Sequence, residues 1–116
     1  MKKISGLLLF TVLILFACNK ENNWIELDIV ETGCMNAWDD FYTGDNDSRD
    51  AVQRYLKHNG ISVYRVYSHS YYDGPVCLAC YCPTGRLIVI QIPEQDQTKA
   101  EQLGFQRVIN GDFNIP

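Results

Sequence analysis

The segment RLIVIQI, residues 86–92, is the most continuous apolar run outside the first 18 residues. A short apolar run that is rich in β-branched residues and stopped by Pro93 is typical of a central β-strand with both faces covered. Because such a strand needs neighbours on both edges, the rest of the chain must supply further strands and a covering layer.

A first neighbour is expected at residues 24–29, where apolar and acidic side chains alternate. Alternation of this kind predicts a strand with one buried face. The competing interpretation is a helix that begins after Asn23, has Glu26 in a capping-box position and ends at Gly33.

A second neighbour is expected at residues 61–72, which are rich in β-branched and aromatic residues. The alternation slips near Arg65, so we expect a bulge or bend there. Residues 106–109 suit a last, short edge strand before the turn at Asn110-Gly111.

Two helices are expected between these strands. The first is capped by Asp47 or Ser48 and ends at Asn59-Gly60, and the second covers residues 94–103 and stops before Gly104. The order strand, helix, strand, strand, helix, with a final edge strand, predicts an α+β two-layer sandwich: an antiparallel sheet with two helices on one face, in a ferredoxin-like arrangement.

The first 18 residues, MKKISGLLLFTVLILFAC, have the layout of a secretory signal. Lys2 and Lys3 form a basic start, an apolar run covers residues 7–16, and the small Ala17 precedes Cys18. The apolar run is too short to span a bilayer, which takes about 20 residues.

Leu15, Phe16, Ala17 and Cys18 resemble the lipobox of bacterial lipoproteins. The resemblance implies that residues 1–17 are removed and that Cys18 is acylated as the new first residue. Several acyl chains give stable membrane anchoring. The resemblance also implies that Asn19 permits transport to the outer membrane of the cell envelope. Residues 18–23 then form a polar tether with a reach of about 12 Å.

The remaining 99 residues suit one small domain, which we place at residues 24–110, followed by a frayed tail at 111–116. This mature chain has a net charge of −6. Nucleic acid and anionic lipid are therefore poor partners.

Four cysteines remain in an oxidising compartment: Cys34, Cys77, Cys80 and Cys82. Disulfides are the default for a small exported domain, and four cysteines allow three pairings. A bond closing the six residues 77–82 stabilises by about 2 kcal/mol in the chain-entropy model, and one closing residues 34–80 by about 4 kcal/mol. A bond between Cys80 and Cys82 would close only three residues and would be strained. We therefore expect Cys34 to pair with Cys80 or Cys82 and the other two cysteines to pair locally; the preferred set is Cys34–Cys80 with Cys77–Cys82.

Two alternatives use the same cysteines without structural disulfides. Cys77 and Cys80 form a CxxC pair that suits thiol redox chemistry, with Cys82 as a nearby resolving thiol, although no helix is predicted after the pair to lower a thiol pKa. The four thiolates, with His69 as a substitute ligand, also suit Zn²⁺ or Cu(I). The favoured disulfide interpretation requires no metal and no cofactor.

The sequence contains no GxSxG, glycine-rich phosphate loop or HExxH, so a binding or structural role is expected ahead of an enzymatic one. Tyrosines are enriched at interfaces. A candidate surface for an envelope protein or a small ligand is formed by Tyr64, Tyr67, Tyr71, Tyr72 and Tyr81.

Overall fold

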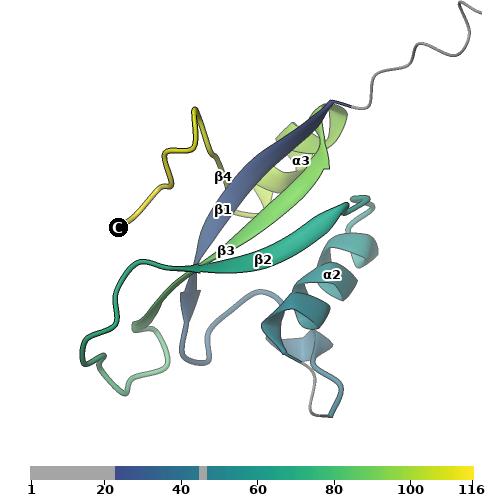
Figure 1. The fold of residues 1–116 in the computed structure, drawn as a ribbon. Helices are drawn as coiled ribbons and strands as arrows, with labels where there is room; N and C mark the ends of the chain where they lie inside the picture. Colours follow the sequence, from purple (N-terminus) through teal and green to yellow (C-terminus); the bar gives the residue numbers. More distant parts are fainter. Residues whose placement is uncertain (1–22, 45–46) are drawn as a thin grey trace, which may run out of the picture.

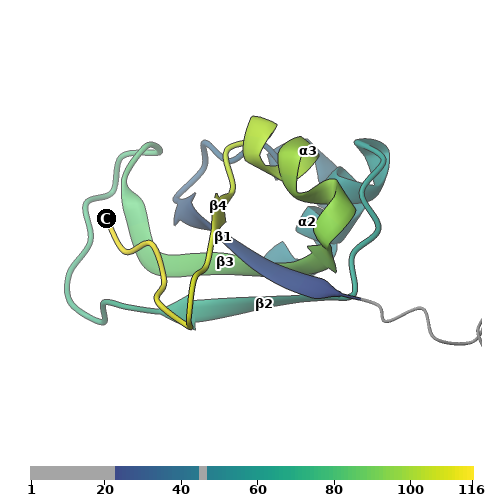
Figure 2. The ribbon, with the colours of Figure 1, turned by 90° about the horizontal axis from the view of Figure 1, so that it is seen from above.

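The computed structural model describes residues 23–44 and 47–116. Within them, one antiparallel sheet has the strand order β2-β3-β1-β4, and two α-helices lie together on one of its sides (Figures 1 and 2). The elements are β1 (Trp24–Thr32), α2 (Ser48–His58), β2 (Arg65–Ser70), β3 (Pro83–Pro93), α3 (Gln97–Gln102) and β4 (Gln106–Arg107). The predicted α+β sandwich and the β-α-β-β-α-β order are confirmed. The predictions for residues 1–17, Cys18 and the tether up to residue 22 lie outside the described residues.

β3 is the central strand that the apolar run predicts, and it pairs with β1 on one edge and β2 on the other. Its side chains at Ile88, Ile90 and Ile92 belong to the core beneath the helices. Leu87 and Val89 point to the opposite face, yet both are completely buried as well. A strand that is covered on both faces is therefore apolar at nearly every position.

β1 settles the choice between strand and helix at the start of the domain. It pairs with β3 from Trp24 opposite Pro93 to Val30 opposite Leu87, so the helical interpretation is wrong. The register shifts at Glu31, between Val30, which pairs with Leu87, and Thr32, which pairs with Pro83. The cross-strand pairing, rather than local propensity, decides this segment.

The helix α2 forms where its capping signals predict it. The Asp47 carboxylate accepts hydrogen bonds from the backbone N–H groups of Arg49 and Asp50, and Gly60 has a φ of +75° just after the helix, as a helix C-terminus prefers. The second predicted helix is shorter than expected, because residues 94–96 form a 3-10 turn before α3. Gly104, with φ of +99°, follows it.

The strand predicted at residues 61–72 is too long, since β2 covers only residues 65–70. Ile61 is buried in the core below α2 instead of entering the sheet. The chain bends at Tyr64, whose N–H donates to the Gln91 carbonyl at 2.8 Å. The irregularity expected near Arg65 is therefore present, and it marks the start of the strand. The last edge strand, β4, has two residues instead of four.

The C-terminal tail, expected to fray, packs on the face of the sheet away from the helices. Asn114 donates from its backbone N and its Nδ2 to the two carboxylate oxygens of Asp28, at 2.8 and 3.0 Å. The Phe113 ring stacks on His69 with centroids 4.3 Å apart. Figure 2 shows this segment passing to the side of the sheet opposite the helices. Residues opposite each other in a sheet share a face, and His69 is opposite Leu87, so the tail helps to cover β3.

Candidate functional site

Cys77, Cys80 and Cys82 lie in the connection between β2 and β3, residues 71–82, which we call the cysteine loop, and Cys34 lies just after β1. The structure contains two disulfides, Cys34–Cys80 and Cys77–Cys82, with Cα atoms 4.5 and 5.8 Å apart. These are the two pairs that the sequence favoured. The first joins the cysteine loop to the segment after β1, and the second closes the loop on itself.

Backbone hydrogen bonds hold the same two segments together. Gly33 donates to the carbonyl of Cys82 at 3.0 Å, and Cys34 donates to the carbonyl of Cys80 at 3.1 Å. Tyr71 donates to the carbonyl of Gly85 at 2.8 Å, where the loop leaves β2. The cysteine loop is thus tied to β1 and β3 by covalent and hydrogen bonds at both ends.

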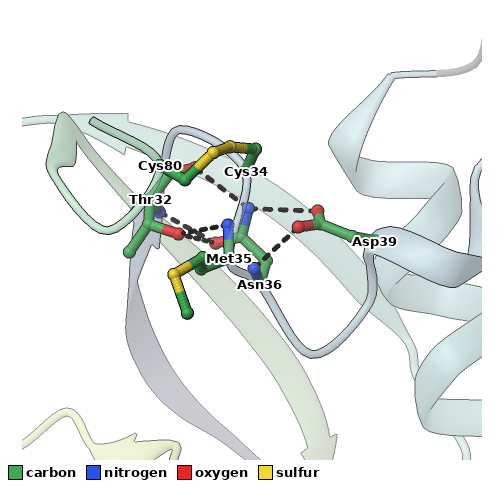
Figure 3. The surroundings of a disulfide bond; sticks show 6 residues. All are labelled: Thr32, Cys34, Met35, Asn36, Asp39 and Cys80. Atoms are coloured by element: carbon green, nitrogen blue, oxygen red, sulfur yellow. Dashed lines mark hydrogen bonds between the residues drawn. A yellow bond between two sulfur atoms is a disulfide. The ribbon is translucent and has the colours of Figure 1, made fainter. Parts of the chain in front are cut away.

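The segment that carries Cys34 is itself fixed by the side chain of Asn36 (Figure 3). Its Oδ1 accepts from the backbone N of Thr32 at 2.8 Å, and its Nδ2 donates to the Thr32 carbonyl at 2.9 Å. Asp39 accepts from the Asn36 backbone N at 2.7 Å. The Asn36 side chain therefore bonds to the end of β1 at Thr32, and its Nδ2 also donates to Asp39 at 3.1 Å. Such side-chain hydrogen bonds stabilise a loop that has no regular structure.

Large apolar side chains in the cysteine loop and next to Cys34 face solvent. Leu78 is 99% exposed, Tyr81 72% and Met35 66%. We call this surface the apolar patch; its members are Met35, Tyr72, Val76, Leu78 and Tyr81. Residues 75–84 contain no charged side chain. Exposed apolar patches on small proteins often mark interaction sites.

The five candidate tyrosines do not form one surface. Tyr72 and Tyr81 belong to the apolar patch, whereas Tyr64 lies at the opposite end of the sheet, stacked on Trp24. Tyr67 lies between them and donates a short hydrogen bond to Glu26. Burial, followed by this hydrogen bond, raises the pKa of Tyr67 to about 12.

Glu31 is a buried carboxylate beside the cysteine loop that sequence reasoning missed. It is 3% exposed, and its Oε1 accepts from Thr84 Oγ1 at 2.9 Å and from Arg86 Nη2 at 2.7 Å. Both donors lie in the first residues of β3, just after Cys82. Its burial could have been predicted from its position, because Glu31 is the next alternate residue after Ile25, Leu27 and Ile29 in β1.

The bonded pairs also bear on the redox and metal alternatives. Cys77 and Cys80 of the CxxC pair are each bonded to another cysteine, and in this oxidised form none of the four sulfurs is a thiolate. His69 is stacked on Phe113. Among the described residues, no group of three or more His, Cys, Asp or Glu side chains is arranged to hold a metal ion. Chemistry at these sulfurs therefore first requires reduction of a disulfide.

Comparisons with protein-family models, curated proteins and solved structures found no match. Within residues 23–44 and 47–116, no helix has the length and apolar character needed to cross a membrane. The geometry of the cysteine loop and its apolar patch therefore carries the functional argument.

Proposed function

We propose that this chain is a lipid-anchored lipoprotein of the bacterial cell envelope, attached to the outer membrane through Cys18, whose apolar patch binds a partner protein. The observation that carries the binding role is the fully exposed Leu78 in a loop held by two disulfides. The lipid anchor rests on the leader sequence and its resemblance to a lipobox.

Rigid presentation supports binding by the patch. An exposed leucine on a mobile loop would lose conformational entropy when it entered a partner's pocket, and that loss weakens binding. Here the disulfides and the Gly33 and Cys34 hydrogen bonds restrict the loop before any partner arrives. Tyr81 adds a large amphipathic ring, a residue type that is enriched at interface hot spots.

The position of the patch, at the end of the sheet far from the anchor, also supports binding of a partner that lies away from the membrane. β1 starts at Trp24, next to the tether, and ends at Thr32, two residues before Cys34. Its nine residues span roughly 30 Å at about 3.3 Å per residue. In Figure 1 the start of β1 and the cysteine loop lie at opposite ends of the sheet. A chain anchored at Cys18 can thus present the patch away from its own membrane.

The chemistry of the patch favours a protein partner over nucleic acid. It offers side chains for an apolar pocket and no cation for a phosphate backbone, which dominates nucleic-acid affinity. The net charge of −6 for residues 18–116 points the same way. The expected partner surface is an apolar depression large enough for one leucine and one tyrosine side chain.

The anchor is tested by expressing the full chain in a bacterial host and measuring the mass of its N-terminal peptide. The expected peptide begins at an acylated Cys18 and partitions with membranes. Cys18→Ser is the matched control, and it should be unacylated and released from membranes after washing. An uncleaved or unacylated native chain refutes the anchor.

The binding role is tested with a photo-crosslinking amino acid at position 78, in the native membrane. Position 102 on α3, also exposed, is the control site. We expect one defined adduct from position 78 that excess native domain suppresses and excess Leu78→Ser domain does not. Equal adducts from both positions, or suppression by both competitors, contradict a specific binding patch.

A further inference from the structure

A second exposed aromatic group lies at the end of the sheet opposite the cysteine loop. Trp24 is 40% exposed and Tyr64 65%, and their rings stack with centroids 4.8 Å apart and planes inclined by 28°. Trp24 is the first residue of β1, and Tyr64 is held at the bend before β2 by its bond to Gln91. We call these two residues the aromatic pair.

We propose that the aromatic pair lies in the headgroup region of the membrane that holds the lipid anchor; this inference rests on the proposed acylation of Cys18. Residues 18–23 are the only link between the anchor and Trp24. Their reach of about 12 Å keeps Trp24 close to the lipid surface. Tryptophan and tyrosine are the residues that prefer this interface, where an apolar ring and a polar tip are both satisfied.

The charge around the pair indicates zwitterionic lipid as its partner. Arg65 lies beside Tyr64 in the chain, but its guanidinium is placed over the ring of Tyr67, 4.8 Å from the centroid. Glu94, whose N–H donates to the Asn23 carbonyl at 3.0 Å, is an exposed acid at the same end. Attraction to anionic lipid depends on clusters of basic residues. Among the described residues near this end, the basic Lys57, Arg65 and Lys99 are matched by the acidic Glu26, Glu94 and Asp96, so no excess of positive charge gathers there.

A second membrane contact has a consequence for orientation. A tether alone would let the domain turn over on the membrane, whereas a tether plus the aromatic pair holds one end of the sheet down. The apolar patch then stands roughly 30 Å farther from the lipid, by the length of β1. A domain held in this orientation keeps the patch available to a partner.

Brominated lipid provides the test, because bromine quenches tryptophan only at short range. The full acylated chain is placed in phosphatidylcholine vesicles whose acyl chains carry bromine near the headgroup end. The chain has two tryptophans, and Trp38, which is 1% exposed, serves as the internal reference. We expect loss of the Trp24 emission and retention of the Trp38 emission. Trp24→Phe, the matched control, should show no quenching.

Further measurements distinguish lipid contact at the aromatic pair from lipid contact at the patch, from self-association and from a missing lipid anchor. Leu78→Trp in the Trp24→Phe background should stay unquenched, and quenching there would show that the patch contacts lipid and would overturn the inference. An acylated native chain without quenching overturns it while leaving the anchor intact. Trp24 emission that depends on protein concentration instead of bromine indicates a second copy on the aromatic pair, which also overturns it. Absence of the acyl group in the mass spectrum refutes both proposals.

Discussion

Removing the Cys34–Cys80 disulfide should destabilise the domain more than removing Cys77–Cys82, although both involve cysteines of the cysteine loop. The two bonds join residues 46 and 5 positions apart. The entropy removed from the unfolded chain grows with the length of the closed loop, which predicts about 4 kcal/mol for the first and about 2 kcal/mol for the second. Cys34 and Cys80 are both exposed, so replacing them with alanine removes little packing. Cys82 is 4% exposed, so its replacement also removes packing. This loss makes the difference in unfolding free energy between the two variants smaller.

The measurement is urea unfolding of oxidised protein, followed by fluorescence of the buried Trp38. Cys34→Ala with Cys80→Ala leaves one disulfide that cannot exchange with another, and Cys77→Ala with Cys82→Ala does the same for the other bond. Non-reducing mass spectrometry confirms the remaining bond in each variant. A larger loss of unfolding free energy from the Cys77 and Cys82 variant would refute the loop-entropy reasoning.

Three further perturbations test the rest of the fold. The protonated form of Tyr67, with its pKa raised to about 12 against an ordinary value of 10.0, stabilises the fold below pH 10 and loses this contribution as the pH rises toward 12. Replacing Glu26 with glutamine should lower that pKa in an ultraviolet titration of tyrosinate, and an unchanged titration would contradict the role of the hydrogen bond. Asp47→Ala removes the acceptor for two backbone amides of α2 and should lower the melting temperature; Asp47→Ser, which keeps a capping oxygen, should lose less. Asn114→Ala leaves the buried Asp28 carboxylate without two donors and should cost roughly 1–3 kcal/mol in urea unfolding, whereas a tail that does not pack would give no change.

The candidate site was only partly predictable from the sequence. Loop entropy and the strain of a bond between Cys80 and Cys82 favoured a long-range bond from Cys34 and a local bond in the cysteine loop, because both depend on spacing along the chain. The structure decides that Cys80, and not Cys82, is the partner of Cys34. The exposure of Leu78 did not follow, because an isolated leucine in a loop can equally turn inward. Glu31 was missed because an acidic residue at a buried position is stable only with its donors, which lie more than 50 residues later in β3.

The separation of Tyr64 from Tyr81 illustrates the same limit. Both follow apolar or β-branched segments, and their nearness in the sequence favoured one tyrosine-rich surface. The strand β2 and the cysteine loop carry them to opposite ends of the sheet, so that one joins the aromatic pair and the other the apolar patch. A strand advances about 3.3 Å per residue, so even a short one separates its two ends.

By itself the sequence determined the element types, the central position of β3, the cap of α2 and the favoured disulfide pairing, because hydrophobic period, capping chemistry and loop length act locally or scale with chain distance. Only the tertiary structure decided the length of each strand, the burial of Glu31 and the packing of Asn114 on Asp28. These features depend on which distant groups meet across the sheet. Burial of a polar group becomes stable only once its partner has been brought there by the fold.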